Sequence, residues 1–313
     1  MRFFLATLIV AFAAVASFAQ SPPTLRIVTE VPNLPSELFY GDVKVKPLRL
    51  RPGTNTPITI NDADFYVTQQ YVDFLSRFPD QSGFTFWQNE ITQCGANASC
   101  VDSKRVHVSA AFFLSIEFQE TGYLVYKMHE AAFGNLPGLP VPVRRANFMP
   151  DTRTIGNGIV VGAPGWQDAL NSNKDAFALA FVQRPAFTAA FPNTMTAQQF
   201  VDKLDTNAGG VLSTTDKSNL VAVLGGTPAD PTKRASVLRS VAENANLTSR
   251  DFNKAFVLMQ YFGYLRRDPD AAPDTNFDGF NFWLGKLNQF NGDFVQAEMV
   301  RAFIVSGEYL NRF

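Results

Sequence analysis

Alternating oxygen-bearing side chains make the segment from Asp274 to Gly279 the part of the sequence best suited to bind a cation. Asp274, Asn276 and Asp278, followed by Gly279, match the first half of an EF-hand calcium loop, whose ligands at positions one, three and five converge on one cation. The bidentate acid required at position twelve is replaced by Gly285, which predicts weak calcium affinity. A solvated turn held by its own Asp and Asn side chains is the preferred interpretation, and calcium is the alternative.

The two histidines, His107 and His129, are the other candidates for acid–base or metal chemistry. No motif with a nucleophilic serine accompanies them, and neither Glu117 nor Glu130 lies at a recognised zinc spacing from them. We therefore expect two structural histidines and assign no catalytic residue. A catalytic histidine pair is the alternative.

Cys94 and Cys100 are the only cysteines, in the run Cys-Gly-Ala-Asn-Ala-Ser-Cys. In an exported protein this spacing predicts a small disulfide loop, whereas a catalytic thiol pair or a metal site is the alternative. Closing so short a loop contributes roughly 2–2.5 kcal/mol in the chain-entropy picture. The disulfide should therefore fix one connection between helices rather than hold the whole fold.

Residues 1–19 have the organisation of a secretory signal peptide. Arg2 supplies the charge, residues 3–16 are almost entirely apolar, and small residues precede a cut that would leave Gln20 first. A membrane anchor is the alternative, but the apolar run is shorter than the ~20 residues that a span needs. We expect an exported protein, periplasmic, at the cell surface or extracellular, with no membrane span in the mature chain.

The composition narrows the range of partners. The formal net charge is −1 and only 18% of the residues are charged, with no basic stripe along the sequence. Nucleic acid and anionic membrane surfaces are therefore not expected partners. Thirty phenylalanines indicate a strongly aromatic core rather than a disordered chain.

A turn signature that occurs twice, here called the head, indicates which elements position these residues. The first head contains Tyr71, Arg77, Pro79, Asp80, Gly83 and Trp87, and the second contains Tyr261, Arg267, Pro269, Asp270, Gly279 and Trp283. In each head an aromatic helix ends before Pro-Asp, and a second helix opens on Gly-Phe-x-Phe-Trp. In the first head we expect Asp80 to cap that second helix.

A second repeated element, the closing motif, places aromatic residues six positions apart at a helix end. It covers residues 112–118, 181–187 and 303–309, and it contains Glu117 in the first copy and Glu308 in the last. We expect the arginine of each head to pair with the glutamate of its closing motif, or with the carbonyl groups of the turn. Such a pair, when partly buried, costs several kcal/mol to break from one side.

These repeats predict an all-α, repeat-built bundle of short amphipathic helices behind an extended Pro-rich arm. The predicted segments are the arm at 20–60, a first unit at 61–135, a Pro/Gly-rich loop at 136–165, a degenerate middle unit at 166–247 and a last unit at 248–313. The helices expected within the later units are one at 166–191 kinked at Pro185, two that begin at capping boxes at 196–199 and 248–251, and a final one at 294–311.

At the heads and closing motifs the chain resembles the domain-of-unknown-function family 4214. Members of that family carry a Tyr-x-x-x-Leu-x-Arg-x-Pro-Asp-x-x-Gly-x-x-x-Trp head and a Ser-x-Glu-Phe closing motif. The head matches Tyr71, Leu75, Arg77, Pro79, Asp80, Gly83 and Trp87, and again Tyr261, Leu265, Arg267, Pro269, Asp270, Gly279 and Trp283. The closing motif matches Ser115, Glu117 and Phe118, and again Ser306, Glu308 and Tyr309. The resemblance covers about residues 61–313, although the middle copy lacks Pro-Asp and Trp. It implies an all-helical exported bacterial protein, often beside adhesion or calcium-binding repeats, with no established activity.

We expect a non-catalytic interaction module that binds a protein or a cell-surface glycan and holds no cofactor. One alternative is an adhesion or matrix domain stabilised by calcium. Another is a cell-envelope hydrolase, which would need a cleft that gathers Glu117, Glu120, Glu130 or aspartates with a raised carboxyl pKa. The tryptophans and phenylalanines are expected in the core, and an exposed aromatic binding patch is the alternative.

Overall fold

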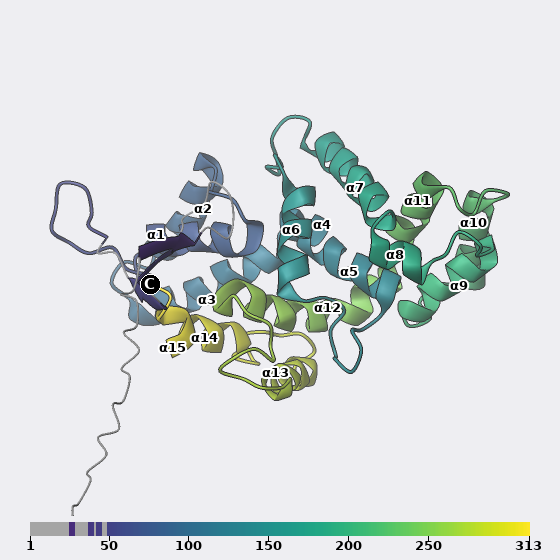
Figure 1. Cartoon of the computed structure of the whole chain (residues 1–313). Coiled ribbons are helices and arrows are strands. Elements are labelled where there is room, and N and C mark those ends of the chain that lie inside the picture. The colour runs from purple at the N-terminus through teal and green to yellow at the C-terminus, as the bar shows by residue number, and fades with distance from the viewer. Residues whose placement is uncertain (1–24, 29–36, 41, 46–48) are drawn as a thin grey trace, which may run out of the picture. The chain divides into compact units, whose positions relative to one another are not determined.

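The computed structural model describes residues 25–28, 37–40, 42–45 and 49–313, so the predicted signal peptide at 1–19 lies outside the described residues (Figure 1). The chain divides into two compact units, one ending at Pro47 and one starting at Leu48. Within the described residues, no helix is both long and apolar enough to cross a bilayer.

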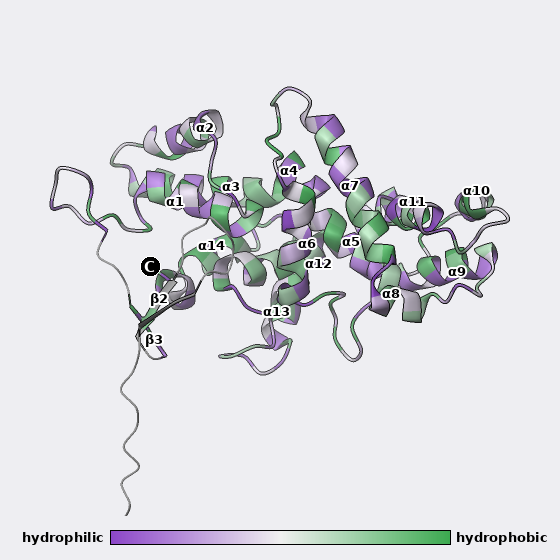
Figure 2. Cartoon of the chain, turned by 45° about the horizontal axis from the view of Figure 1, so that its top comes forward, coloured by the Kyte–Doolittle hydropathy of each residue, from purple (hydrophilic) through white to green (hydrophobic). Residues whose placement is uncertain are grey.

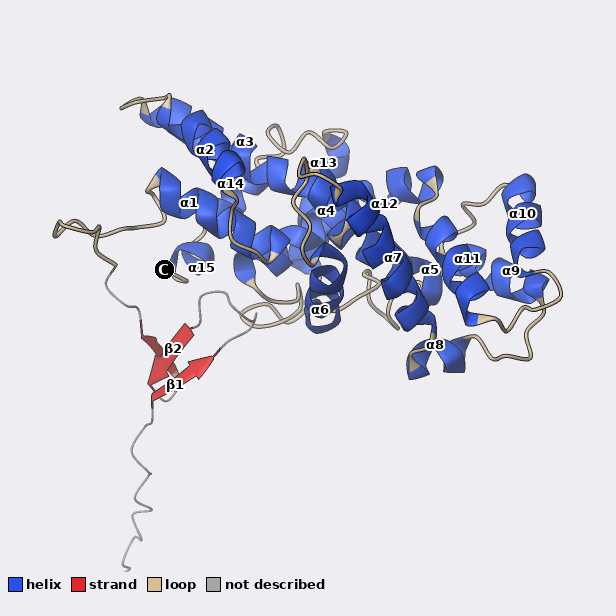
Figure 3. Cartoon of the chain, turned by 90° about the horizontal axis from the view of Figure 1, so that it is seen from above, coloured by secondary structure: helices blue, strands red, loops and turns tan. Residues whose placement is uncertain are grey.

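The first unit contains a small antiparallel sheet in the order β1-β2-β3 (Figure 3). Its strands are β1 (Leu25–Val28), β2 (Glu37–Tyr40) and β3 (Val43–Val45). Leu25 pairs with Tyr40, and Leu38 with Val45. The extended pieces predicted in the Pro-rich arm are therefore strands.

The helical unit begins before the boundary predicted at residue 60. Arg51 forms salt bridges with Asp62 and Asp64 at 2.9 and 2.7 Å, and Ile60 is buried in the core of the helical unit. These contacts attach the last part of the predicted arm to the first helix.

The second unit is all-α, as predicted. Its elements are α1 (Ala63–Gln70), η1 (Tyr71–Leu75), α2 (Gln81–Thr92), α3 (Ala98–Leu114), α4 (Ile116–Glu120), α5 (Gly122–Phe133), α6 (Arg145–Gly156), α7 (Trp166–Val182), α8 (Pro185–Ala190), α9 (Ala197–Asn207), α10 (Thr214–Leu224), α11 (Pro231–Ala242), α12 (Ala245–Gln260), η2 (Tyr261–Leu265), α13 (Asp278–Gln289), α14 (Met299–Ile304) and α15 (Gly307–Leu310). Helices α3, α5 and α14 are rich in hydrophobic residues, and they line a continuous aromatic core (Figure 2).

Both heads have the same backbone course. The helices α1 and α12 each end in a π-helical turn, η1 or η2, and then in a left-handed residue, Ser76 (φ 52°) or Arg266 (φ 53°). In the first head, Asp80 accepts a hydrogen bond from the Gly83 amide at 2.8 Å and so caps α2, as predicted.

The tyrosine that opens each head explains why a glycine follows the Pro-Asp turn. A Cβ atom at Gly83 would lie 2.2 Å from the Tyr71 hydroxyl, and one at Gly279 would lie 2.7 Å from the Tyr261 hydroxyl. Neither position has room for a side chain, so the repeated glycines are required by packing.

The closing motifs are also alike in detail, because a serine interrupts each of the two full copies. Ser115 Oγ accepts from the Phe118 amide at 3.1 Å and donates to the Phe112 carbonyl at 2.8 Å. Ser306 Oγ makes the same two bonds, to Tyr309 and Phe303, at the same distances. Each serine caps the helix that follows it, α4 or α15. The predicted final helix at 294–311 is therefore wrong in its bounds, because the helical residues form two short helices, α14 and α15, of which the first begins only at Met299.

The two heads pack directly against each other through η1 and η2. The rings of Phe74 and Tyr264 meet edge to face with centroids 5.0 Å apart, and the Tyr264 hydroxyl donates to Gln70 Oε1 at 3.0 Å. A Cβ atom at Gly263 would lie 3.0 Å from the Phe74 ring, so this close approach also requires a glycine.

The prediction of a loop over residues 136–165 is wrong for residues 145–156, which form α6. The high Pro and Gly content of the segment hid a helical pattern in which Phe148, Met149, Thr152 and Ile155 are buried on one face. Pro150 lies within this helix and removes one of its backbone hydrogen bonds.

Two other helix boundaries differ from prediction. The helix expected over 166–191 is two helices, because Pro185 takes the first position of α8 and leaves a break after Val182. The capping box predicted at Thr248 is wrong, because Asn244 already caps α12 and Thr248 lies inside that helix. The capping box at Thr196 is confirmed.

Candidate functional site

A bidentate ion pair joins the first head to its closing motif. Arg77 Nε and Nη2 donate to the two carboxylate oxygens of Glu117, both at 2.7 Å. Arg77 Nη1 donates to the Phe78 carbonyl at 3.0 Å. The predicted pairing is confirmed, and the arginine also holds the turn that follows it.

The second head forms the equivalent ion pair, and its arginine makes additional hydrogen bonds. Arg267 donates to the Glu308 carboxylate at 2.6 and 3.1 Å and to Asp274 Oδ2 at 2.8 Å. Its Nη1 also donates to the carbonyls of Asp268, Pro269 and Ala271. These contacts give the repeated arginines and glutamates a structural role.

The segment considered for calcium has its oxygens engaged within the protein. Asp274 accepts from Arg267, while Asn276 Oδ1 accepts from the Asp278 amide and Asn276 Nδ2 donates to Asp278 Oδ2, both at 2.9 Å. A calcium ion would have to compete with an arginine for Asp274. Calcium binding at this turn stays a prediction.

The two histidines lie in different environments. His107 is exposed, and its Nδ1 lies 2.8 Å from the Ser103 carbonyl oxygen. His129 is buried, with Nε2 3.0 Å from Asp151 Oδ2, and Arg184 also donates to Asp151. Burial alone would raise the pKa of Asp151, but the bonds from His129 and Arg184 lower it overall. This cluster holds α5, α6 and the α7–α8 break together.

The acidic residues named for a hydrolase engage three different cations. Glu117 pairs with Arg77, Glu120 with Lys174 and Glu130 with Arg250. Burial raises the pKa of Glu130, and the nearby Asp251 adds to this effect. Glu117 and Asp80 both line a small cavity of about 230 Å³, and both pair there with Arg77, whereas Glu120 and Glu130 do not line it. The structure therefore does not gather these carboxylates around one point.

Lys127 is a buried lysine, and the pH dependence of stability can test how strongly burial shifts its pKa. Its Nζ donates to Thr248 Oγ1 at 2.8 Å and lies 4.7 Å from the centre of the Tyr123 ring. Burial lowers the pKa of Lys127 to about 8, although Glu120 and Glu243 oppose this shift. In the unfolded chain the lysine titrates near 10.4. Between these values the unfolded state binds more protons than the folded state, so stability should rise with pH.

We expect the free energy of unfolding, measured in urea, to rise between pH 7.5 and pH 9.5. This rise should be about 2 kcal/mol larger in the native protein than in the variant Lys127→Met. Tyrosines of the unfolded chain begin to ionise in this range, but they do so equally in both proteins and cancel in the difference. Equal pH slopes in the two proteins would show that the lysine is not buried as described.

Cys94 and Cys100 form the predicted disulfide, with Cα atoms 5.5 Å apart, and it closes the connection between α2 and α3. The tryptophans Trp87, Trp166 and Trp283 lie partly buried against the core. The aromatic side chains that remain exposed belong instead to phenylalanines, among them Phe86 and Phe282.

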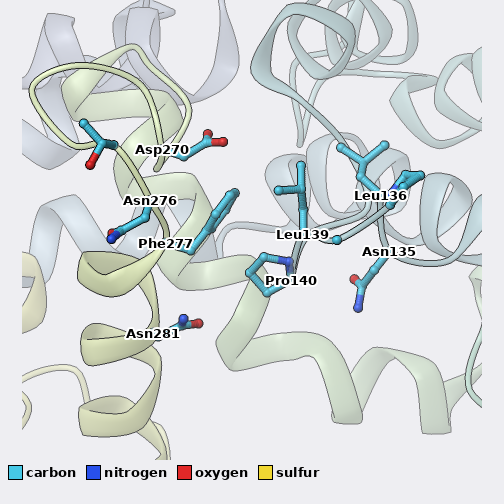
Figure 4. Close-up of a pocket in the computed structure, with 11 residues that line it drawn as sticks. Asn135, Leu136, Leu139, Pro140, Asp270, Asn276, Phe277 and Asn281 are labelled. Carbon is cyan, nitrogen blue, oxygen red and sulfur yellow. The ribbon is translucent and has the colours of Figure 1, made fainter.

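A groove of about 770 Å³ lies between the second head and the segment that follows α5. Figure 4 shows Asn276, Phe277 and Asn281 on one side of it, facing Leu139 and Pro140 on the other. The lining residues are Asn135, Leu136, Pro137, Gly138, Leu139, Pro140, Asp270, Thr275, Asn276, Phe277 and Asn281.

The groove carries little net charge. Asp270 is its one titratable lining residue, and Arg144 donates to both of its carboxylate oxygens. This pairing with Arg144 holds the pKa of Asp270 below its ordinary value. The residues that line the groove therefore carry no unpaired charge, and Lys254 lies beside them.

Several polar groups of the groove keep hydrogen-bonding capacity for a ligand. Within the described part of the chain, the side chains of Asn281 and Thr275 make no hydrogen bond. Asn135 uses its oxygen to accept from Lys254 at 2.7 Å, which leaves its amide nitrogen available among the described residues. The apolar lining consists of Leu136, Leu139, Phe277 and prolines, so the groove combines amides with apolar surface.

Sequence reasoning missed this groove. The sequence patterns assigned residue 135 to the first unit, residues 136–140 to a connecting loop, and Asn276 to a turn or a calcium site. A signal was present, because both segments are rich in Asn, Pro and small residues. Nothing in the sequence indicated that they meet.

In comparisons of the chain with protein-family models, with curated proteins and with solved structures, nothing matches. The resemblance to the domain-of-unknown-function family 4214 therefore stays a prediction carried by the repeated heads and closing motifs.

Proposed function

We propose that the protein is an exported, non-catalytic interaction module that binds its partner in the groove between residues 135–140 and the second head. The neutral groove with uncommitted amides is the observation that carries this proposal. An enzyme of hydrolytic type would instead require carboxylates directed into a cleft. The acidic residues considered for that role are engaged by arginine or lysine.

Export is supported by the signal-like pattern of residues 1–19 and by the disulfide between Cys94 and Cys100. Disulfides persist mainly in oxidising compartments outside the cytosol. We therefore place the interaction at the cell surface, in the periplasm or outside the cell.

A photo-crosslinking side chain at Asn281, inside the groove, tests this function. Matched control probes replace Val223, an exposed residue of α10 that does not line the groove. After illumination with cell-envelope material, we expect a defined covalent adduct from the Asn281 probe and none from the Val223 probe. The mass of the adduct, after protease or glycosidase digestion, shows whether the partner is a polypeptide or a glycan. No adduct, or equal adducts from both probes, would contradict the proposal.

A further inference from the structure

An exposed phenylalanine occupies the same position in both repeats. Phe86 on α2 and Phe282 on α13 are each 58% exposed, and each follows its Pro-Asp turn in the run Gly-Phe-x-Phe-Trp. Phe86 meets Trp87 edge to face at 4.8 Å, and Phe282 meets Trp283 in the same way at 5.0 Å. Neither ring is needed to fill the core, so both remain available to a ligand.

The polar groups around these rings are mostly uncharged. Thr85 and Asn89 are exposed beside Phe86, and Asn281 is exposed beside Phe282. The charged groups nearby have partners. Glu90 pairs with Lys104 at 2.6 Å, Lys286 lies 3.8 Å from Glu298, and Asp278 accepts from Asn276.

Phe282 follows a groove residue on α13 but is not itself one of the lining residues. Asn281, which lines the groove, immediately precedes Phe282 on α13, and Figure 4 shows its side chain on the groove side of that helix. A ligand in the groove can therefore contact the amides of Asn281 and Asn135, and a ligand long enough to pass over the edge of α13 would meet the exposed ring of Phe282.

These features select a class of ligand. The Asn281 carboxamide offers an acceptor and donors side by side, and Asn135 keeps its amide donors while its oxygen accepts from Lys254. These groups suit hydroxyl groups, which both donate and accept. A phenyl ring offers a flat apolar face, which suits the C–H face of a sugar ring. The lining itself holds no unpaired charge, because Arg144 donates to both carboxylate oxygens of Asp270. Lys254, the other cation beside the groove, donates to Asn135.

We infer that the groove binds a neutral oligosaccharide, with one sugar ring stacked on Phe282 and hydroxyl groups bonded to Asn281 and Asn135. The inference rests on the proposed function and specifies the partner. The equivalent face around Phe86 provides a second stacking site of weaker affinity, because the amide-lined groove is not beside it.

Isothermal titration of the purified protein with cellohexaose and chitohexaose tests the inference, and a heparin hexasaccharide serves as the charged control. We expect at least one neutral hexasaccharide to bind and the heparin fragment not to bind. Phe282→Ala and Asn281→Ala should each weaken binding about five- to tenfold, whereas Phe86→Ala should weaken it less than twofold. The substituted side chains are exposed, and unchanged thermal melting of each variant confirms that it is folded.

Absence of binding by both neutral sugars, preferential binding of heparin, or equal affinity of Phe282→Ala and the native protein would each overturn the inference. If the Asn281 photo-probe gives a polypeptide adduct while neither sugar binds, the groove is an interaction site but not a saccharide site. If the probe gives no adduct and neither sugar binds, the proposed function fails as well.

Discussion

We expect Asp73→Asn to lower the free energy of unfolding by about 3–5 kcal/mol, because it removes the negative charge from a buried ion cluster. The Asp73 side chain is 0% exposed and accepts from Arg266 at 3.1 Å and from Arg312 at 2.9 and 2.7 Å. Asparagine has the same shape, but it leaves the guanidinium groups of Arg266 and Arg312 without this carboxylate. Its side-chain NH2 group would also face the arginine N–H groups, which are donors and cannot accept a hydrogen bond. Urea denaturation followed by far-ultraviolet circular dichroism measures the loss, which corresponds to a fall of about 10 °C in the melting temperature.

Asp175→Asn is the matched control, since Asp175 also accepts from an arginine, Arg239, at 2.6 Å. Its side chain is 72% exposed, so the same substitution should change stability by no more than ~1 kcal/mol. Equal effects of the two substitutions would show that burial of Asp73 does not determine the strength of its contacts.

Asp73 also shows what the repeat could not predict. Comparison of the two heads found the Arg77–Glu117 and Arg267–Glu308 pairs, because both copies contain the same residues at these positions. The position that corresponds to Asp73 in the second head is Gly263. A position that differs between the copies carries no repeat signal, and the partners of Asp73 come from the other end of the chain.

The difference between the two positions has a physical reason. The two heads face each other through η1 and η2, where Phe74 packs against the backbone at Gly263. A side chain fits on one side of this contact only. The repeated sequence therefore predicts the architecture of each unit, whereas the junction between the units depends on residues that break the repeat.

The groove could not be predicted from the sequence for a related reason. Local patterns predicted the all-α class, the cap at Asp80 and the capping box at Thr196, since these depend on neighbours along the chain. The groove forms where residues 135–140 meet the second head, and Arg144 joins Asp270 across the same junction. Contacts between segments so far apart in sequence follow from packing of the whole unit, and a single sequence does not reveal them.

The second large effect is expected at the repeated ion pair, and the two copies allow an internal comparison. Glu117→Gln should lower the free energy of unfolding by about 3 kcal/mol, because the Glu117 side chain is 8% exposed and Arg77 loses the carboxylate that it contacts with two nitrogens. Glu308→Gln should cost only about 1 kcal/mol. The Glu308 side chain is 33% exposed, and Arg267 keeps Asp274 at 2.8 Å, whereas Arg77 keeps only the more distant Asp80, at 3.5 Å.

A double-mutant cycle separates the pairing from other effects of each substitution. Combining Arg77→Met with Glu117→Gln should recover a large part of the loss, since neither charge is then left buried without its partner. The same cycle for Arg267 and Glu308 should give a smaller coupling energy, because Arg267 also holds Asp274 and the carbonyls of its turn. Equal coupling in the two cycles, measured by urea denaturation, would contradict the view that burial of the glutamate and the closer second carboxylate of Arg267 distinguish the two copies.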